Sequence, residues 1–400
     1  MIRIRYLLCF LLALLTACAQ VSVPPTAHIS KSTTPLPEKL VTITPTQPIQ
    51  PTPEATLTAT ALPTIAFTTT PAPTSIFTPL IREESGELYK TLFTIPVGGN
   101  SVIQYLDSGC CISGPNALAV LPNGSFLISD MVSEFRLLHY SPTGELLGTI
   151  PLKEMNILWV YSMRIQNNIL YLLARDFQDS FSVYEMTLDG QVKTVHAFSG
   201  KFAIGGGNLL EQGLTGMMID CEQNILLEVE GGGALYRLAD VQSHTDPTGL
   251  TSGFSCLDQL YHILPSGSQG IRQFAAGETI FSTNVTEQLG GLNLLEGFGD
   301  GSFYLIRTDV VSDPVIHVDE TVHYIGADRM PHGMARLPIE ELYYTDYIHS
   351  SIAVSDKGEL FVLLPRQDSI SVIRLNFYQQ LEPFMPSEVA PQITSSASQP

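Results

Sequence analysis

Short apolar runs separated by turn residues recur along the chain from about residue 84 to residue 380. The clearest set lies between Gly114 and Pro151, with apolar runs at 117–120, 125–129, 135–140 and 145–150. An Asn-Gly pair, Asn123-Gly124, separates the first two runs and predicts a hairpin, because both central residues of a type I′ turn need a positive φ. The pattern predicts a four-stranded antiparallel unit, which needs neighbours of its own kind to bury both faces.

Similar units follow this one. A second is predicted over 158–198, and a third from about 214, followed by a polar insertion at 240–253. Only two strands, 260–264 and 279–283, are predicted in the next part. A further unit is predicted at 292–295, 302–307, 314–318 and 322–325, with a turn at Asp319-Glu320 between its last two strands. A final unit begins at Ser351.

The first and last units align with each other. Ala119-Val120 corresponds to Ala353-Val354 and Gly124 to Gly358. Five steps of a ring between these glycines give about 47 residues per unit, which suits a four-stranded propeller blade. The unit Ala117 to Gly144 resembles the NHL-type six-bladed β-propellers. That resemblance implies an all-β fold, a β-propeller with six four-stranded blades. The lone strand at 89–96 is predicted to complete the last blade and so to remove free edges.

The amino terminus resembles a bacterial lipoprotein signal. Arg3 and Arg5 precede an apolar run that is too short for a finished membrane span. The sequence Leu15-Thr16-Ala17-Cys18 then resembles the lipobox, which implies that Cys18 is acylated and becomes the new amino terminus. Two acyl chains would suffice for stable anchoring. An ordinary secretory signal and an uncleaved anchor remain the alternatives.

A Thr/Pro-rich segment follows Cys18. From Val21 to Leu80, 12 residues are Pro, 16 are Thr and only four are charged. Such a segment cannot bury enough apolar surface to fold, and it predicts a disordered, extended stalk. We therefore expect a signal peptide at 1–17, the lipidated cysteine and linker at 18–83, a β-propeller domain at 84–380 and a disordered tail at 381–400.

The net charge is −19 with 15% charged residues. This balance argues against nucleic-acid binding, which needs a cationic surface. The expected partners are the membrane, through the lipid anchor, and a protein or glycan ligand. The expected location is extracytoplasmic, anchored by lipid at the bacterial cell surface.

Four cysteines lie in the part predicted to be exported, where thiols are often oxidised. Cys221 follows a strand and Cys256 ends the polar insertion, so a disulfide between them would pin that insertion. The neighbours Cys110 and Cys111 are candidates for an adjacent-residue disulfide. Four free, buried cysteines are the alternative, and spacing alone cannot select the pairing.

No motif for catalysis or metal binding is complete. His317 and His323 flank the predicted turn and would approach each other across a hairpin, but no metal ligand set is predicted. In the predicted inner strands only Asp220 and Asn293 offer oxygen ligands, with Asp130, Asp300 and Asp356 at strand ends. We predict no cofactor, although calcium or another divalent cation is an option.

The sequence thus favours a membrane-anchored extracytoplasmic propeller that acts as a binding module for a protein or glycan. The alternative is an extracellular metal-dependent hydrolase or lyase, similar to lactonase-like propellers that hold a cation on the axis. The catalytic residues of such an enzyme are not identified by the sequence.

Overall fold

The computed structural model describes residues 79–382, with internal gaps. The gaps are 84–85, 100, 109–111, 133, 179, 198–202, 205–206, 209–213, 230–233, 244–251, 265–268, 274–275, 284–290, 313–315 and 345–347. The chain divides into two units, Met1–Ala72 and Pro73–Pro400, and every described residue belongs to the second. The predicted signal peptide, Cys18, the predicted stalk, Cys110, Cys111 and most of the predicted tail lie outside the described residues. In the part that is described, no helix is long and apolar enough to span a bilayer.

The described chain forms six consecutive antiparallel sheets, the blades of a β-propeller, as the sequence predicts. Blade 1 holds β5 (Leu118–Val120), β6 (Phe126–Asp130), β7 (Arg136–Tyr140) and β8 (Leu146–Pro151); blade 2 holds β9 (Ile157–Gln166), β10 (Ile169–Asp176), β11 (Phe181–Thr187) and β12 (Val192–Ala197); blade 3 holds β15 (Leu214–Ile219), β16 (Ile225–Val229) and β17 (Ala234–Arg237). Blade 4 holds β18 (Phe254–Cys256), β19 (Gln259–Leu264), β20 (Gln269–Gln273) and β21 (Thr279–Thr283); blade 5 holds β22 (Gly291–Gly297), β23 (Phe303–Ser312), β24 (Ile316–Ile325) and β25 (Pro331–Arg336); blade 6 holds β26 (Ile352–Val354), β27 (Leu360–Pro365), β28 (Ser369–Leu375) and β2 (Tyr89–Pro96).

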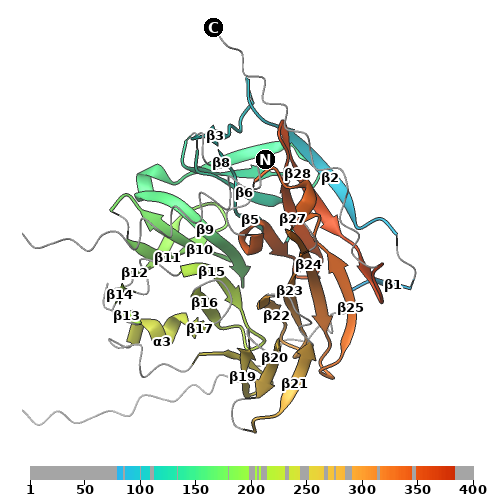
Figure 1. Ribbon diagram of the computed structural model, residues 1–400. Coiled ribbons are helices and arrows are strands. Elements are labelled where there is room, and N and C mark those ends of the chain that lie inside the picture. Colours follow the sequence, from blue (N-terminus) through green and yellow to red (C-terminus); the bar gives the residue numbers. More distant parts are fainter. Residues whose placement is uncertain are drawn as a thin grey trace, which may run out of the picture. The chain divides into compact units, whose positions relative to one another are not determined.

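The first strand of each blade is its inner strand. β5 contacts the inner strands β9 and β26, and β15 contacts β9 and β22. Figure 1 shows β5, β9, β15 and β22 around the middle of the ring. The apolar side chains of neighbouring blades pack face to face, as in the cluster of Phe126, Ile128, Leu363 and Val372 between blades 1 and 6. Each blade therefore buries one face on each neighbour.

Strand β2 is the outer strand of blade 6. It pairs antiparallel with β28, with Tyr89 opposite Leu375 and Pro96 opposite Ser369. This confirms the prediction that a strand from the amino-terminal side completes the last blade. Just before it, β1 (Ile81–Arg82) pairs parallel with β29 (Phe377–Tyr378) on the edge of blade 5. The two ends of the ring are thus held on neighbouring blades.

One turn recurs within the blades. In this turn the backbone N–H of the first residue donates to the carbonyl of the fifth residue. The backbone N–H of the fourth residue donates to the carbonyl of the first. The first residues are Leu121, Ser141, Thr187, Asp220, Phe298, Gly326 and Ser355. The fourth residue always has a positive φ, as at Gly124 with +82°. This is the turn with a left-handed bulge residue, not the type I′ turn predicted for Asn123-Gly124. Two consecutive positive φ values occur instead at Asn167-Asn168 and at Leu257-Asp258.

The second half of the ring departs from the prediction in two places. Asp319 and Glu320 do not form a turn, because they lie within the continuous ten-residue strand β24. His317 and His323 therefore lie on one strand, six residues apart, and do not face each other across a hairpin. In blade 4 the structure adds the short strands β18 and β20 to the two that were predicted.

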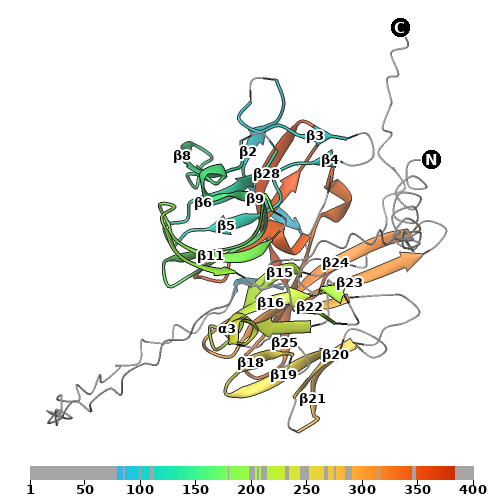
Figure 2. The same cartoon turned by 90° about the vertical axis from the view of Figure 1, so that its left-hand side faces the viewer.

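Two further features mark this half. The polar insertion predicted at 240–253 begins with helix α3 (Leu238–Ser243), which follows β17 where the other blades place a fourth strand. Strands β23 and β24 extend beyond β22, which pairs with β23 only as far as Thr308, so their far ends form a projecting hairpin (Figure 2).

Candidate functional site

A cluster of buried polar side chains spans the propeller axis. Its members come from blades 2, 3, 5 and 6. Blades 2 and 5 are opposite each other in a six-membered ring, and so are blades 3 and 6. Arg164 of blade 2 nevertheless contacts Glu296 of blade 5, and Glu228 of blade 3 contacts His349, just before blade 6. Contacts between opposite blades must cross the centre, so these residues define an axial cluster. It comprises Arg164, Glu228, Asn293, Glu296, Glu320 and His349.

The first cross-axis contact joins inner strands β9 and β22. The Nε atom of Arg164 lies 3.5 Å from Oε2 of Glu296, and both side chains are almost completely buried. Arg164 Nη1 also donates to the carbonyl of Met163 at 2.8 Å. Burial raises the pKa of Glu296 to about 8, although the charge of Arg164 opposes the shift. Burial thus favours the protonated form of Glu296, which can donate a hydrogen bond.

The second contact involves a ring nitrogen. Strand β26 is preceded by the 3-10 helix η4 (Ile348–Ser351), which places His349 over the axis. His349 Nδ1 lies 3.6 Å from Glu228 Oε2, and Nε2 lies 3.3 Å from the Nδ2 atom of Asn293. Burial lowers the pKa of His349, but the hydrogen bond with Glu228 and the charges of Glu228 and Glu320 outweigh it. The net effect is a raised pKa.

Glu320 and Glu228 supply the remaining carboxyl groups. Glu320 accepts a hydrogen bond from Thr308 Oγ1 at 3.3 Å, across strands β23 and β24. Burial raises the pKa of Glu320, and the charge of His349 opposes that shift. Glu228 lies beside Gly216 of β15, where a side chain would crowd its carboxylate: an added Cβ would lie 3.1 Å from Oε2. Glu228 also accepts a hydrogen bond from Thr215 Oγ1 at 2.9 Å.

Four buried polar atoms of the axial cluster have no hydrogen-bond partner among the described residues. Two of them, Arg164 Nε and Glu296 Oε2, face each other as the ion pair at 3.5 Å, and the other two are Asn293 Oδ1 and Glu320 Oε2. A buried polar atom left unpaired costs about 1–3 kcal/mol, so such atoms normally meet water or a ligand. The convergence of several ionisable groups with shifted pKa values is typical of functional sites.

The sequence anticipated only one member of this cluster, Asn293. Asp220 is not an axial ligand. Its Oδ1 accepts hydrogen bonds from the backbone of Glu222 and Asn224, and its Oδ2 accepts from the backbone of Ser255 in blade 4. It thus stabilises a turn and the contact between two blades.

The aspartates at strand ends also have local roles. Asp130 pairs with Arg136 at 3.1 Å. Asp300 accepts from the backbone N–H of Ser302 in a turn, and Asp356 is exposed. Among the residues that the structure describes, no group of three or more His, Cys, Asp or Glu is arranged to hold a metal ion.

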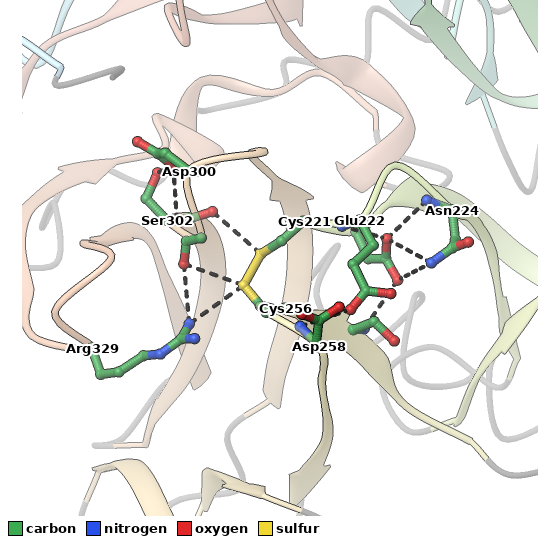
Figure 3. The surroundings of a disulfide bond; sticks show 11 residues. Cys221, Glu222, Asn224, Cys256, Asp258, Asp300, Ser302 and Arg329 are labelled. Atoms are coloured by element: carbon green, nitrogen blue, oxygen red, sulfur yellow. Dashed lines mark hydrogen bonds between the residues drawn. A yellow bond between two sulfur atoms is a disulfide. The ribbon is translucent and has the colours of Figure 1, made fainter. Parts of the chain in front are cut away.

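The structure pairs Cys221 and Cys256 in a disulfide, as proposed from the sequence (Figure 3). The bond joins the turn after β15 to the inner strand of blade 4. Blade 5 covers it: the carbonyl oxygens of Ser302 and Gly301 lie 3.5 and 3.2 Å from the two sulfur atoms. Arg329 Nη1 donates to the Gly301 carbonyl at 3.0 Å and lies 3.4 Å from Cys256 Sγ. The disulfide therefore sits where three blades meet.

This junction lies one residue from the axial cluster. Gly297, which follows Glu296, packs so closely that an added Cβ would lie 2.4 Å from the backbone nitrogen of Cys221. The close backbone approach fixes the end of β22, and with it the position of Glu296, against blade 3. Sequence reasoning missed this link because it depends on a contact between distant segments.

Comparison with known proteins gives structural likenesses only. No protein-family model matches the chain, and no curated protein matches it. Solved structures that resemble it include a glucose dehydrogenase, with 10% identity, a TM-score of 0.38, and 72% of this chain and 99% of that chain covered. A virginiamycin B lyase from Staphylococcus aureus has 11% identity, a TM-score of 0.33 and coverages of 72% and 98%. A putative 6-phosphogluconolactonase from Bacteroides uniformis has 14% identity, a TM-score of 0.35 and coverages of 64% and 79%. These values carry no argument about the reaction or ligand of this chain.

Proposed function

We propose that the protein is a lipid-anchored, extracytoplasmic binding module whose axial cluster receives a ligand from the cell surface. The lipobox-like sequence ending at Cys18 supports the anchor, and the Thr/Pro-rich segment supports a stalk between anchor and propeller. The partner is a protein or a glycan that presents a polar group to the axis.

One observation carries the proposal. Polar side chains from four blades converge on the axis, and two of their buried atoms, Asn293 Oδ1 and Glu320 Oε2, have neither a hydrogen-bond nor an ion-pair partner among the described residues. A purely structural core would exclude such groups, because each unpaired polar atom lowers the stability of the fold. A ligand that supplies hydrogen bonds would recover this free energy on binding.

The test uses the full-length chain in detergent and insoluble cell-envelope material from the bacterium, with and without protease treatment. We expect the protein to co-sediment with the envelope. The substitution His349→Gln should lower the affinity for the envelope by about tenfold. Arg374→Met, which removes a surface pair with Glu359, is the control and should bind like the wild type. Equal binding by all three proteins would contradict an axial binding site.

A second function, an extracellular hydrolase or lyase, is favoured by one observation. Glu296 has a pKa of about 8 because it is buried, and a protonated carboxyl group near neutrality suits a general acid. Metal analysis of the full-length protein, with thermal melts in the presence and absence of EDTA, distinguishes a metal-dependent hydrolase or lyase from the binding module. One equivalent of a divalent metal and a melt lowered by EDTA would favour that enzyme over the binding module.

A further inference from the structure

We propose that His349 is a pH-dependent switch at the propeller axis: protonation of its imidazole turns the side-chain amide of Asn293 and joins blade 3 to blade 5 through the imidazole. The contacts of the two imidazole nitrogens, an unpaired amide oxygen and the charges around the imidazole support it. The switch needs no ligand, so its test is independent of the envelope assay.

The two imidazole nitrogens of His349 face different blades. Nδ1 lies 3.6 Å from Oε2 of Glu228, on β16 of blade 3. Nε2 lies 3.3 Å from Nδ2 of Asn293, on β22 of blade 5. All three side chains are largely buried. Blade 4 separates blades 3 and 5 in the propeller, so the imidazole bridges two blades that are not neighbours.

A neutral imidazole leaves one atom of this arrangement without a partner. The ionised carboxylate of Glu228 only accepts hydrogen bonds, so the single imidazole proton must be on Nδ1, and Nε2 then accepts from Asn293 Nδ2. In this orientation of the amide, the buried Oδ1 of Asn293 has no hydrogen-bond partner among the described residues. An unpaired buried acceptor destabilises the arrangement.

A protonated imidazole gives that oxygen a partner. Both nitrogens of His349 then donate, Nδ1 to Glu228 and Nε2 towards Asn293. The NH₂ group of Asn293 is itself a donor and can no longer face Nε2, so the amide turns over and presents Oδ1 to the imidazole. The amide thus has two discrete orientations, and one proton selects between them.

The switch changes what Asn293 offers to a ligand of the axial cluster. With a neutral imidazole the amide presents its oxygen, an acceptor, and with a protonated imidazole it presents its NH₂ group, a donor. This consequence rests on the proposed function, whereas the switch itself does not.

The charges around the imidazole favour the protonated state. Burial lowers the pKa of His349, and so does the charge of Arg164, which is paired with Glu296. The hydrogen bond with Glu228 and the charges of Glu228 and Glu320 outweigh both, so the pKa is raised above 6.5. Of the described elements that pack against η4, which are β9, β26 and β27, only β9 carries a charged residue, and that residue is Arg164.

The test follows nitrogen-15-labelled histidine and asparagine by NMR in the full-length protein in detergent, from about pH 5 to about pH 9. We expect the His349 imidazole to titrate with a midpoint above 6.5. The side-chain NH₂ signal of Asn293 should shift with the same midpoint. Asn293→Leu identifies that signal, and His349→Gln should abolish its dependence on pH.

Two further variants separate the switch from a general effect of pH. Glu228→Gln keeps the size of the side chain but removes its charge, and it should lower the His349 midpoint by about one pH unit. His332→Gln removes an exposed histidine that pairs with Asp328 at 2.9 Å, and it should leave the His349 midpoint unchanged. Thermal melts establish that each variant is folded. Glu320→Gln gives the same test from blade 5 if Glu228→Gln is not folded.

The same proton should affect the stability of the fold. A histidine whose pKa is higher in the folded protein stabilises it below the unfolded pKa, and that stabilisation is lost as the pH rises through the folded pKa. The folding equilibrium constant of the wild type, divided by that of His349→Gln, should therefore fall between about pH 6 and about pH 9. Glu296 is present in both proteins, so the ratio isolates His349.

Two results would overturn the inference. An imidazole that titrates below 6.5, or that stays neutral throughout, would mean that burial outweighs the carboxylates. An imidazole that titrates above 6.5 without any change in the Asn293 signal would mean that the proton adds charge but does not turn the amide.

Discussion

Glu296 retains its proton at pH values where an exposed glutamate has lost it. Burial among the inner strands raises its pKa from 4.5 to about 8. Between these two pH values the folded protein favours the protonated carboxyl group, whereas the unfolded chain favours the ionised one. A glutamate whose pKa is higher in the folded than in the unfolded protein stabilises the fold below pH 4.5. That stabilisation is lost as the pH rises towards 8.

The variant Glu296→Gln tests this linkage, because glutamine resembles the protonated acid at every pH. The difference in unfolding free energy between variant and wild type should rise in favour of the variant between pH 5 and pH 8. The rise should be at least about 1.4 kcal/mol, the equivalent of one pKa unit. Urea denaturation at several pH values measures it. A difference that does not change with pH would mean that Glu296 ionises normally.

The seven recurrent turns differ in the residue at their fourth, left-handed position. Five of the seven have glycine at the left-handed position, while Gln223 and Arg329 occupy it in the other two with φ of +65° and +68°. A non-glycine residue in this conformation costs about 1–2 kcal/mol.

Replacing Gln223 by glycine should therefore stabilise the protein by about 1 kcal/mol, since the backbone carbonyl that accepts from Gln166 remains. The matched control is Gly124→Ala, which should destabilise the protein by a similar amount. The space around Gly124 is open, with no atom within 3.7 Å of an added Cβ, so only the backbone conformation changes. Thermal or urea unfolding checks both. A destabilising Gln223→Gly would contradict the strain argument.

At the scale of elements, the disulfide and the backbone contact at Gly297 hold blades 3, 4 and 5 together. The bond closes a loop of 35 residues. It adds a covalent link to blade 4, whose inner strand β18 has three residues.

Removing both cysteines, as Cys221→Ala with Cys256→Ala, should lower the stability by about 3–4 kcal/mol, the value expected for a loop of this length. Wild-type protein unfolded in the presence of a reductant should lose a similar amount, and the double variant should not respond to reductant. A wild type insensitive to reductant throughout unfolding would indicate that the disulfide does not form.

The elements show which parts of the fold a sequence reveals. Blades 1 and 6 were predictable because glycine turns and short apolar runs are local signals. Strand β24 was missed because Asp319 and Glu320 look like a turn, whereas Asp319 pairs with Arg336 at 2.8 Å on the neighbouring strand β25. Blade 4 was only half predicted because β18 has three residues, and because Gln and Gly make up much of β20.

The axial cluster was largely hidden for a different reason. Arg164 and Glu296 lie within apolar stretches, where single polar residues carry no motif. They become a site only because six blades close into a ring and bring opposite blades together. The cue available in the sequence was an ionisable residue in a predicted inner strand.

At the scale of the whole molecule, the proposed anchor depends on a single residue. Cys18→Ala should abolish acylation and release the protein from the membrane fraction, because the apolar run before it is too short for a membrane span. Labelling with a radioactive fatty acid and cell fractionation measure this. Cys9→Ala, in the same segment, is the matched control and should still be labelled. An unlabelled wild type would favour an ordinary secretory signal or an uncleaved anchor.

The pairing of β1 with β29 brings the two ends of the propeller domain close enough for a circular permutation of the chain. Ile81 lies directly opposite Phe377, so the first and last strands of the ring are neighbours. A short linker could join them, and new termini could be opened at the exposed turn Asn167-Asn168 without removing a strand. Such a circular permutant should keep all six blades and the cluster at their centre. The order in which the blades are translated is therefore separable from the order in which they pack.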